Sequence, residues 1–149
     1  MQESTAPMLL TQHQQLIESA CETIRECACV NRKILVERVL SLEQAMLDHL
    51  DVEEDVILQP YAICAPHDAA SILAANGDLR RQLFQVSLDA QLDRIRAPAL
   101  EQLAASLRSH LSPKDRNMYV WAQSSLPLKI KRELWLLALR SVGSLTVRV

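Results

Sequence analysis

Four histidines and one glutamate could do chemistry here, because they fall on or beside the apolar faces of expected helices. His13, His49 and His110 lie in register with apolar residues at helical spacing, and His67 opens another helical stretch. Glu53 follows His49 by four residues, so both side chains project from one helix face. A buried carboxylate costs on the order of several kcal/mol unless it is paired or bound to a metal. Imidazole and carboxylate together suit iron, zinc or manganese, so these residues predict a metal site.

A metal-free interpretation stands beside this one. A single histidine on an apolar face is often a hydrogen-bonded core residue rather than a ligand. Glu53 also belongs to an acidic cluster with Asp51, Glu54 and Asp55, and such clusters are usually solvated. Only Glu53 is in register with the apolar stripe. We therefore expect Glu53 to point inward and the other three carboxylates to face water.

Amphipathic helices must position these residues. Thr11 is a plausible N-cap for the first helix, Pro60 should kink or end the second, and Gly77 is a weak point in the third. Pro98 suits the first turn of the fourth helix, which carries His110. The first two expected helices cover about residues 11–30 and 32–63. The third starts after Pro66 and runs to about residue 94, and the fourth starts near Pro98 and includes Leu111.

The segment after His110 allows two interpretations. Helix four could continue, but Pro113 would remove a backbone hydrogen bond from its interior. Alternatively, Ser112 is an N-cap and Pro113 the first residue of a new helix. In that case His110 and Asp115 need not share a face. Further on, residues 127–141 predict a short helix followed by a loose end, because residues 142–149 have strand-like composition but no evident strand partner.

Composition supports an all-helical chain. Hydrophobic residues make up 49% of the 149 residues, aromatic residues only 3%, and there are only 2 glycines. Leu, Ala, Glu, Gln and Arg dominate, and these are good helix formers. The predicted fold is all-α: an antiparallel up-and-down four-helix bundle over about residues 8–124, with a short C-terminal fifth helix. We expect one domain, residues 1–149.

Charge and cysteine content argue against a nucleic-acid-binding protein and against a cysteine-based zinc or redox site. The formal net charge of −2 gives no reason to expect a nucleic-acid partner. Cys21, Cys27, Cys29 and Cys64 match no zinc or redox spacing, and we interpret them as reduced thiols of a cytoplasmic protein. We expect no signal peptide and no transmembrane segment. No arrangement for nucleophilic catalysis is evident, so we expect no catalytic residue and do not expect an enzyme.

The segment from His49 to Pro60, His-Leu-Asp-Val-Glu-Glu-Asp-Val-Ile-Leu-Gln-Pro, resembles the His-x-x-x-Glu-Glu motif of hemerythrin-like cation-binding domains. The order of candidate ligands along the chain is similar to that family's order: His13, His49, Glu53, His67 and His110. The resemblance implies an antiparallel four-helix bundle that holds one or two non-haem iron ions. It also implies a protein that binds or senses oxygen or nitric oxide, or handles iron.

Two positions depart from the family pattern. Lys114 stands where many members have a carboxylate four residues after the last histidine, and Asp115 could replace it. Ser71 stands where oxygen carriers have a further histidine. These departures leave open a di-iron site, a site for a single iron, and a chain without iron.

Two further alternatives stay open. The chain could be a metal-free regulator or partner-binding module. In that case the basic and apolar C-terminal helix (residues 127–141) could mediate a homodimer or bind another protein. A zinc site of three histidines is the other alternative, although structural zinc usually takes cysteine ligands as well.

Overall fold

The computed structural model describes residues 9–27 and 30–146, and over these ranges it is helical with no strand. The prediction of an all-α chain is confirmed to this extent. None of the helices in the described ranges combines the length and apolar content that a lipid bilayer crossing requires. The elements, in chain order, are α1 (Leu9–Cys27), α2 (Arg32–Val52), the π-helical segment η1 (Glu53–Leu58), α3 (Gln59–Cys64), α4 (Pro66–Gln91), α5 (Ala97–Ser109), α6 (Pro113–Ser125) and α7 (Leu128–Thr146).

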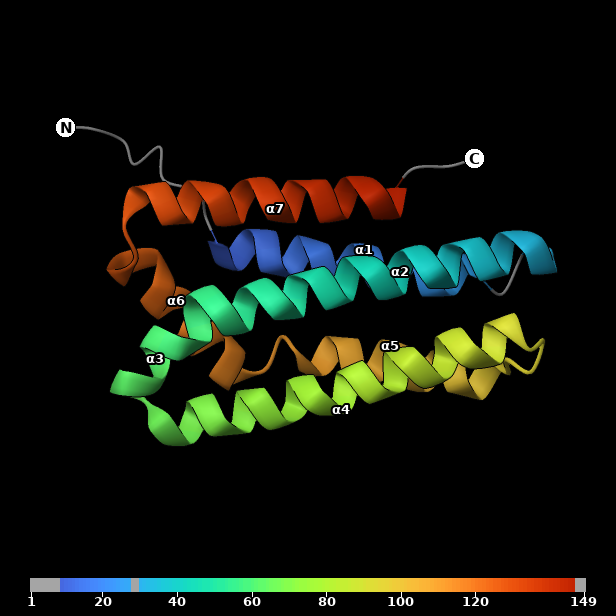
Figure 1. Ribbon diagram of the computed structural model, residues 1–149, viewed down its shortest axis with the longest axis horizontal. Helices are drawn as coiled ribbons and strands as arrows, with labels where there is room; N and C mark the ends of the chain where they lie inside the picture. Colours follow the sequence, from blue (N-terminus) through green and yellow to red (C-terminus); the bar gives the residue numbers. More distant parts are fainter. Residues whose placement is uncertain (1–8, 28–29, 147–149) are drawn as a thin grey trace.

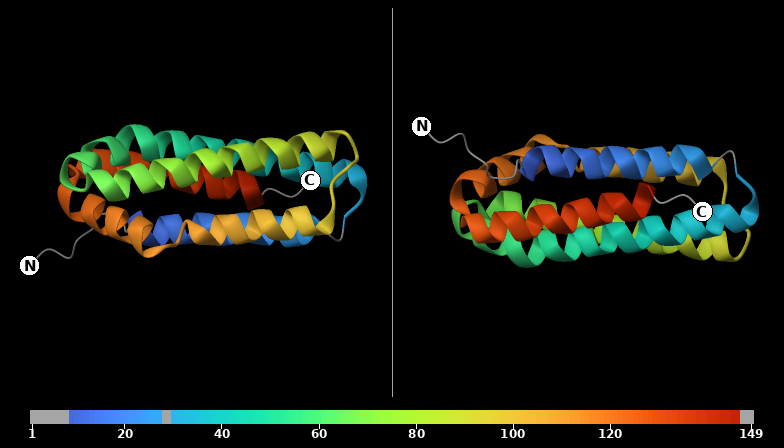
Figure 2. Two further views of the ribbon diagram at one scale, coloured as in Figure 1. Left: turned by 90° about the horizontal axis from the view of Figure 1, so that it is seen from below. Right: turned by 90° about the horizontal axis from the view of Figure 1, so that it is seen from above.

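The long helices run along one axis of an elongated molecule, and the chain reverses direction from each one to the next (Figure 1). α1 contacts α2 and α5, and α4 contacts α2 and α5. α3 and α6 lie together at one end. α7 lies against both α1 and α2 and covers that side of the molecule (Figure 2).

The second predicted helix is continuous from Arg32 to Cys64, but it is not α-helical throughout. Pro60 does not end it. Instead, the six residues before α3 form η1, in which hydrogen bonds span five residues rather than four. Proline has no N–H to donate, and its ring clashes with a carbonyl of the preceding turn, so a widened turn just before it relieves both problems. Gly77 does not interrupt α4.

The fourth predicted helix breaks after His110, as the second interpretation of that segment allowed. His110 is the C-cap of α5, and Ser112 is the N-cap of α6 with Pro113 as its first residue. The Ser112 hydroxyl accepts a hydrogen bond from the backbone N–H of Asp115 and donates one to the Asp115 carboxylate. This reciprocal capping sets where α6 begins.

The C-terminal helix is longer than predicted, because α7 continues to Thr146. The expectation of a loose end from residue 142 is therefore wrong up to residue 146, and residues 147–149 lie outside the described ranges. Cys21 and Cys27 are buried and Cys64 is exposed. Cys29 lies outside the described residues.

Two apolar clusters fill the interior, one on either side of a layer of polar side chains. The first cluster includes Leu16, Ile17, Met46, Leu50, Leu79, Leu83, Leu103 and Leu107. The second includes Leu9, Ile57, Leu58, Tyr61, Ile72, Met118, Tyr119 and Ala122. The first cluster joins α1, α2, α4 and α5. The second cluster lies at the end of the molecule that contains α3 and α6.

Candidate metal centre

The polar layer between the two apolar clusters contains the candidate site. Its members replace apolar residues on the inward faces of their helices and are buried: His13 from α1, Glu53 from η1, Asn76 from α4 and His110 at the end of α5. Their neighbours on each helix belong to one cluster or the other. In α4, for example, Asn76 lies between Ile72 of the second cluster and Leu79 of the first.

Three side chains of this region bring metal-ligand atoms together. One nitrogen from each of His13 and His49 and one carboxylate oxygen of Glu53 all lie within 4.8 Å of one another. His13 and Glu53 retain 2% and 1% of their exposed surface, and the His49 side chain retains 11%. Two imidazoles and one carboxylate are a ligand set that suits a divalent ion of iron, zinc or manganese and leaves coordination positions open.

The His13 ring is held with one nitrogen available. Its Nε2 lies 2.7 Å from the backbone carbonyl oxygen of His110, and because a carbonyl only accepts, Nε2 carries the proton. Nδ1 is then the unprotonated nitrogen. Burial, together with the proximity of the His49 imidazole, lowers the pKa of His13 to about 4. The ring is therefore neutral at physiological pH, which is the form that binds a metal.

Glu53 is fully buried, yet its negative charge is well stabilised. Tyr119 donates a hydrogen bond from its hydroxyl to Oε2 at 2.6 Å, and Asn76 donates one from Nδ2 to Oε1 at 3.0 Å. His49 Nε2 lies 3.3 Å from Oε2, a distance at which a protonated imidazole forms an ion pair with the carboxylate. Burial alone would raise the pKa of Glu53. The contacts with His49, His13 and Tyr119 outweigh burial and hold this pKa well below its usual range.

Asn76 connects the buried carboxylate to charged residues near the surface. Its Nδ2 also lies 3.2 Å from a carboxylate oxygen of Glu54. Arg80 donates hydrogen bonds to both Glu54 and Asp51, at 2.5 and 2.6 Å. The acidic cluster is thus partly paired rather than simply solvated: Glu53 points inward as predicted, while Glu54 and Asp51 pair with Arg80. This chain of contacts fixes the orientation of the Glu53 carboxylate from the α4 side.

Tyr119 completes the immediate surroundings. Its ring stacks on His13 with centroids 4.2 Å apart and an interplanar angle of 17°, while its hydroxyl donates to Glu53. Burial and the Glu53 charge raise the pKa of Tyr119 well above its ordinary value, so the hydroxyl keeps its proton. Tyr119 and Asn76 were not predicted from the sequence. Their position in register with buried residues of α6 and α4 was the signal that could have found them.

The other predicted ligands fall into two groups. His110 and Asp115 are buried beside the cluster, but neither belongs to the group of three within 4.8 Å. Burial lowers the pKa of His110 and raises that of Asp115 to about 6, and the Glu53 charge acts on both. His67 is exposed in the first turn of α4. The structure therefore does not bring His67 to the site, because the inward face of α4 carries Asn76 instead.

Buried nitrogens without a partner mark this layer. Within the described residues, no hydrogen-bond partner is found for His13 Nδ1, His49 Nε2 or His110 Nδ1. Burying a polar atom without a partner is unfavourable, and native proteins rarely do so without a ligand or ion nearby. The nitrogens of His13 and His49 that lie within 4.8 Å of a Glu53 carboxylate oxygen fit a cation. The residues present therefore suit a metal ion.

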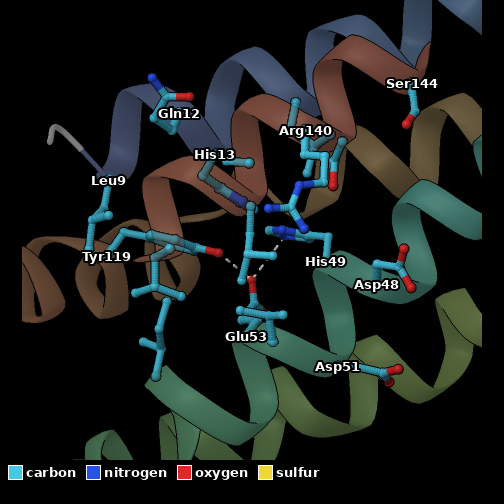
Figure 3. Close-up of a pocket in the computed structure, with 17 residues that line it drawn as sticks. Leu9, Gln12, His13, Asp48, His49, Asp51, Glu53, Tyr119, Arg140 and Ser144 are labelled. Atoms are coloured by element: carbon cyan, nitrogen blue, oxygen red, sulfur yellow. Dashed lines mark hydrogen bonds and ion pairs between the residues drawn. The ribbon is translucent and has the colours of Figure 1, made fainter. Parts of the chain in front are cut away.

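A cavity of about 360 Å³ opens beside the cluster, between α1, α2 and α7 (Figure 3). His13, His49 and Glu53 line one part of it. From α7, Arg140 points into this space toward His49. A small molecule could therefore reach the three candidate ligands from solvent along the inner face of α7.

No protein-family model matches this chain, and no characterised protein or solved structure matches it either.

Proposed function

We propose that this chain is a hemerythrin-like non-haem iron protein that binds one ferrous ion at His13, His49 and Glu53. In this proposal the chain forms an antiparallel up-and-down four-helix bundle with α7 as a fifth helix. The first and third helices of the bundle are α1 and α4. The second runs from α2 to α3, and the fourth runs from α5 to α6. Oxygen or nitric oxide would be the small ligand, bound or sensed in the cytoplasm.

The observation that carries the proposal is the grouping of two imidazole nitrogens and one carboxylate oxygen within 4.8 Å in a buried layer. His13 supports it further, because metal-bound histidines commonly donate their other ring N–H to a backbone carbonyl. Glu53 would supply one negative charge toward a divalent ion. Two imidazoles and one carboxylate favour iron over structural zinc, which prefers a closed set with cysteine.

A site for one ion fits these residues better than a site for two. Among the residues that the structure describes, three candidate ligands lie within 4.8 Å of one another, and His67 is exposed and outside this group. His110 and Asp115 are buried next to the group, and either one would be a candidate for a fourth protein ligand. Bound iron would supply an open coordination position for a diatomic molecule. Leu9, Leu16 and Ile57 line the cavity and would keep that position in an apolar surrounding.

The test is anaerobic loading of the purified chain with ferrous iron, removal of unbound metal, and measurement of iron per chain. The wild-type chain is expected to keep about one iron. Glu53→Ala and His49→Ala are expected to lose at least about tenfold in affinity, since each removes one of three ligands. His67→Ala is the matched control and should bind like the wild type. Circular dichroism checks that each variant folds.

Two results would contradict the proposal. One is a folded wild-type chain that retains no iron. The other is equal loss of iron in His67→Ala and His49→Ala, because that would place the ligands away from the buried layer. A stoichiometry of two ions per chain would instead favour the di-iron site that the resemblance implies.

A second candidate function is a metal-free partner-binding module. Leu128, Leu136 and Leu139 of α7 are exposed, at 43%, 53% and 42%. An exposed apolar row on one helix could bind a second copy of the chain or another protein. Replacing Leu136 and Leu139 by Ser should then abolish self-association on a sizing column. An unchanged elution volume would remove the support for a homodimer through this helix.

A further inference from the structure

The cavity beside the candidate ligands is much larger than a diatomic molecule needs. Its volume of about 360 Å³ lies in the range of pockets that bind small organic molecules. A water molecule occupies about 30 Å³, so the space would hold on the order of ten non-hydrogen atoms. Oxygen or nitric oxide alone would leave most of this volume to water.

One part of the cavity wall is apolar. Leu9 and Leu16 of α1, Ile57 of η1, and Leu134, Leu137 and Ala138 of α7 line it. Such a wall favours a hydrocarbon group over water, by about 0.8 kcal/mol for each buried methylene. The occupant should therefore carry a short apolar portion.

The polar part of the wall has an arginine directed at the candidate metal ligands. Arg140 points from α7 toward His49, and within the described residues it has no ion pair or hydrogen bond (Figure 3). A guanidinium is a planar donor that matches a carboxylate with two parallel hydrogen bonds. Ser141 and Ser144 add hydroxyl groups from the same helix.

With a metal ion bound, the charges around the cavity also favour an anionic ligand. Its charged lining residues are Asp48, Asp51, Glu53 and Arg140. Asp51 is paired with Arg80, whereas Asp48 is exposed and accepts a hydrogen bond from Gln44. With a divalent ion at the site, the positive charges of the ion and Arg140 exceed the negative charges of Asp48 and Glu53, and the net charge is +1. A monoanion would balance it.

We infer that the cavity binds a small amphipathic monocarboxylate, with its carboxylate at Arg140 and the metal and its hydrocarbon chain against the leucines of α1 and α7. Arg140 is then the residue that sets specificity for an anion. The inference rests on the proposed iron site, because the ion supplies part of the positive charge.

The probes are hexanoate, acetate and hexanol, titrated calorimetrically into the anaerobic full chain with and without ferrous iron. Hexanoate combines both recognised features, acetate lacks the chain, and hexanol lacks the charge. We expect the iron-loaded chain to bind hexanoate at least about tenfold more tightly than either of the others.

Two variants separate the two recognition elements. Arg140→Gln should weaken hexanoate binding by about 10- to 100-fold, the worth of a hydrogen bond to a charged group. Arg132→Gln, at another exposed arginine of α7 that does not line the cavity, should leave binding unchanged. Ala138→Phe would fill the apolar part and should weaken hexanoate more than acetate.

The outcomes distinguish this inference from the iron proposal. Iron that binds while hexanoate does not, or hexanoate that binds Arg140→Gln as tightly as the wild type, overturns the inference and leaves the iron site standing. Equal affinity for acetate and hexanoate overturns the amphipathic assignment. If no iron binds, the iron proposal fails. Arg140-dependent binding of hexanoate by the metal-free chain then supports the pocket assignment, and absence of such binding overturns it.

Discussion

Lys114 donates a hydrogen bond from Nζ to the hydroxyl oxygen of Ser71 at 3.1 Å, which joins α6 to α4 at the exposed surface. These are the two positions at which the resemblance to hemerythrin-like domains would place further ligands. Both residues are exposed, whereas His13, Glu53, His110 and Asp115 are buried. The lysine charge is therefore satisfied away from the polar layer, and it does not oppose a cation there.

Restoring the carboxylate at residue 114 is accordingly not expected to create a second iron site. In Lys114→Glu the new side chain would replace an exposed one that reaches toward Ser71, so iron per chain should stay at about one. The measurement is metal content after anaerobic loading. A rise to two ions would mean that residue 114 reaches the layer, and that a di-iron centre was lost by this one substitution.

Tyr119→Phe should weaken iron binding by about tenfold while the chain stays folded. The substitution removes the hydroxyl that donates to Glu53 at 2.6 Å, but keeps a ring that can stack on His13. Competition with a ferrous chelator would measure the change. Tyr61→Phe is the control, because Tyr61 is buried in the second apolar cluster and stacks on Trp121 instead. Similar losses in both variants would contradict a specific role for Tyr119.

Asn76→Leu should lower the free energy of unfolding of the metal-free chain by about 2–3 kcal/mol. It leaves Glu53 Oε1 buried without its donor, and it also removes a contact with Glu54. Urea denaturation would report the change. Ser87→Ala serves as comparison, since it removes another buried polar group of α4 outside the site and should cost about 1 kcal/mol or less. An Asn76→Leu chain as stable as the wild type would show that Glu53 does not depend on this amide.

His13 should make the metal-free chain less stable as the pH falls from about 6.5 to about 4. Burial lowers the pKa of His13 from 6.5 to about 4, so in this window the unfolded chain binds a proton that the folded chain does not. The loss can reach about 3 kcal/mol. Asp115 acts oppositely, because burial raises its pKa from 3.8 to about 6 and its stabilisation grows on acidification.

Because of this opposition, the quantity to measure is the difference between the wild type and His13→Gln at each pH. Urea denaturation at pH 7 and pH 5 should show a larger fall for the wild type. Parallel curves for the two proteins would mean that His13 is not neutral in the folded chain.

The helices were predictable because their causes are local. Apolar spacing, Ser112 with Pro113, and the low glycine content are all visible in the sequence and gave helix positions close to those observed. The pairing of His49 with Glu53 was predictable for the same reason, since a four-residue separation within a helix fixes their relative direction. His13 joined them because its apolar neighbours turn it inward.

His67 was placed in the ligand set by its order along the chain, and this is where the prediction did not match the structure. Its neighbours Ala70 and Ala74 are exposed, and they did not mark an inward face. Asn76, between Ile72 and Leu79, is the residue of α4 that reaches the layer. Amide and phenol side chains are not usual metal ligands, so the pattern of metal-binding residue types did not indicate Asn76 or Tyr119. The cavity and Arg140 depend on how α7 packs across α1 and α2, which no local pattern specifies.

The π-helical segment η1 has a consequence for the length of the chain itself. Because each of its hydrogen bonds spans one residue more than in an α-helix, η1 acts like a single inserted amino acid. One residue turns an α-helix by about 100°, so the insertion rotates everything after it relative to everything before it. A chain shortened by one residue here could keep His49 facing its partners on α1, or keep Tyr61 in the second apolar cluster, but not both. Residue count in this stretch is thus as strongly constrained as residue identity.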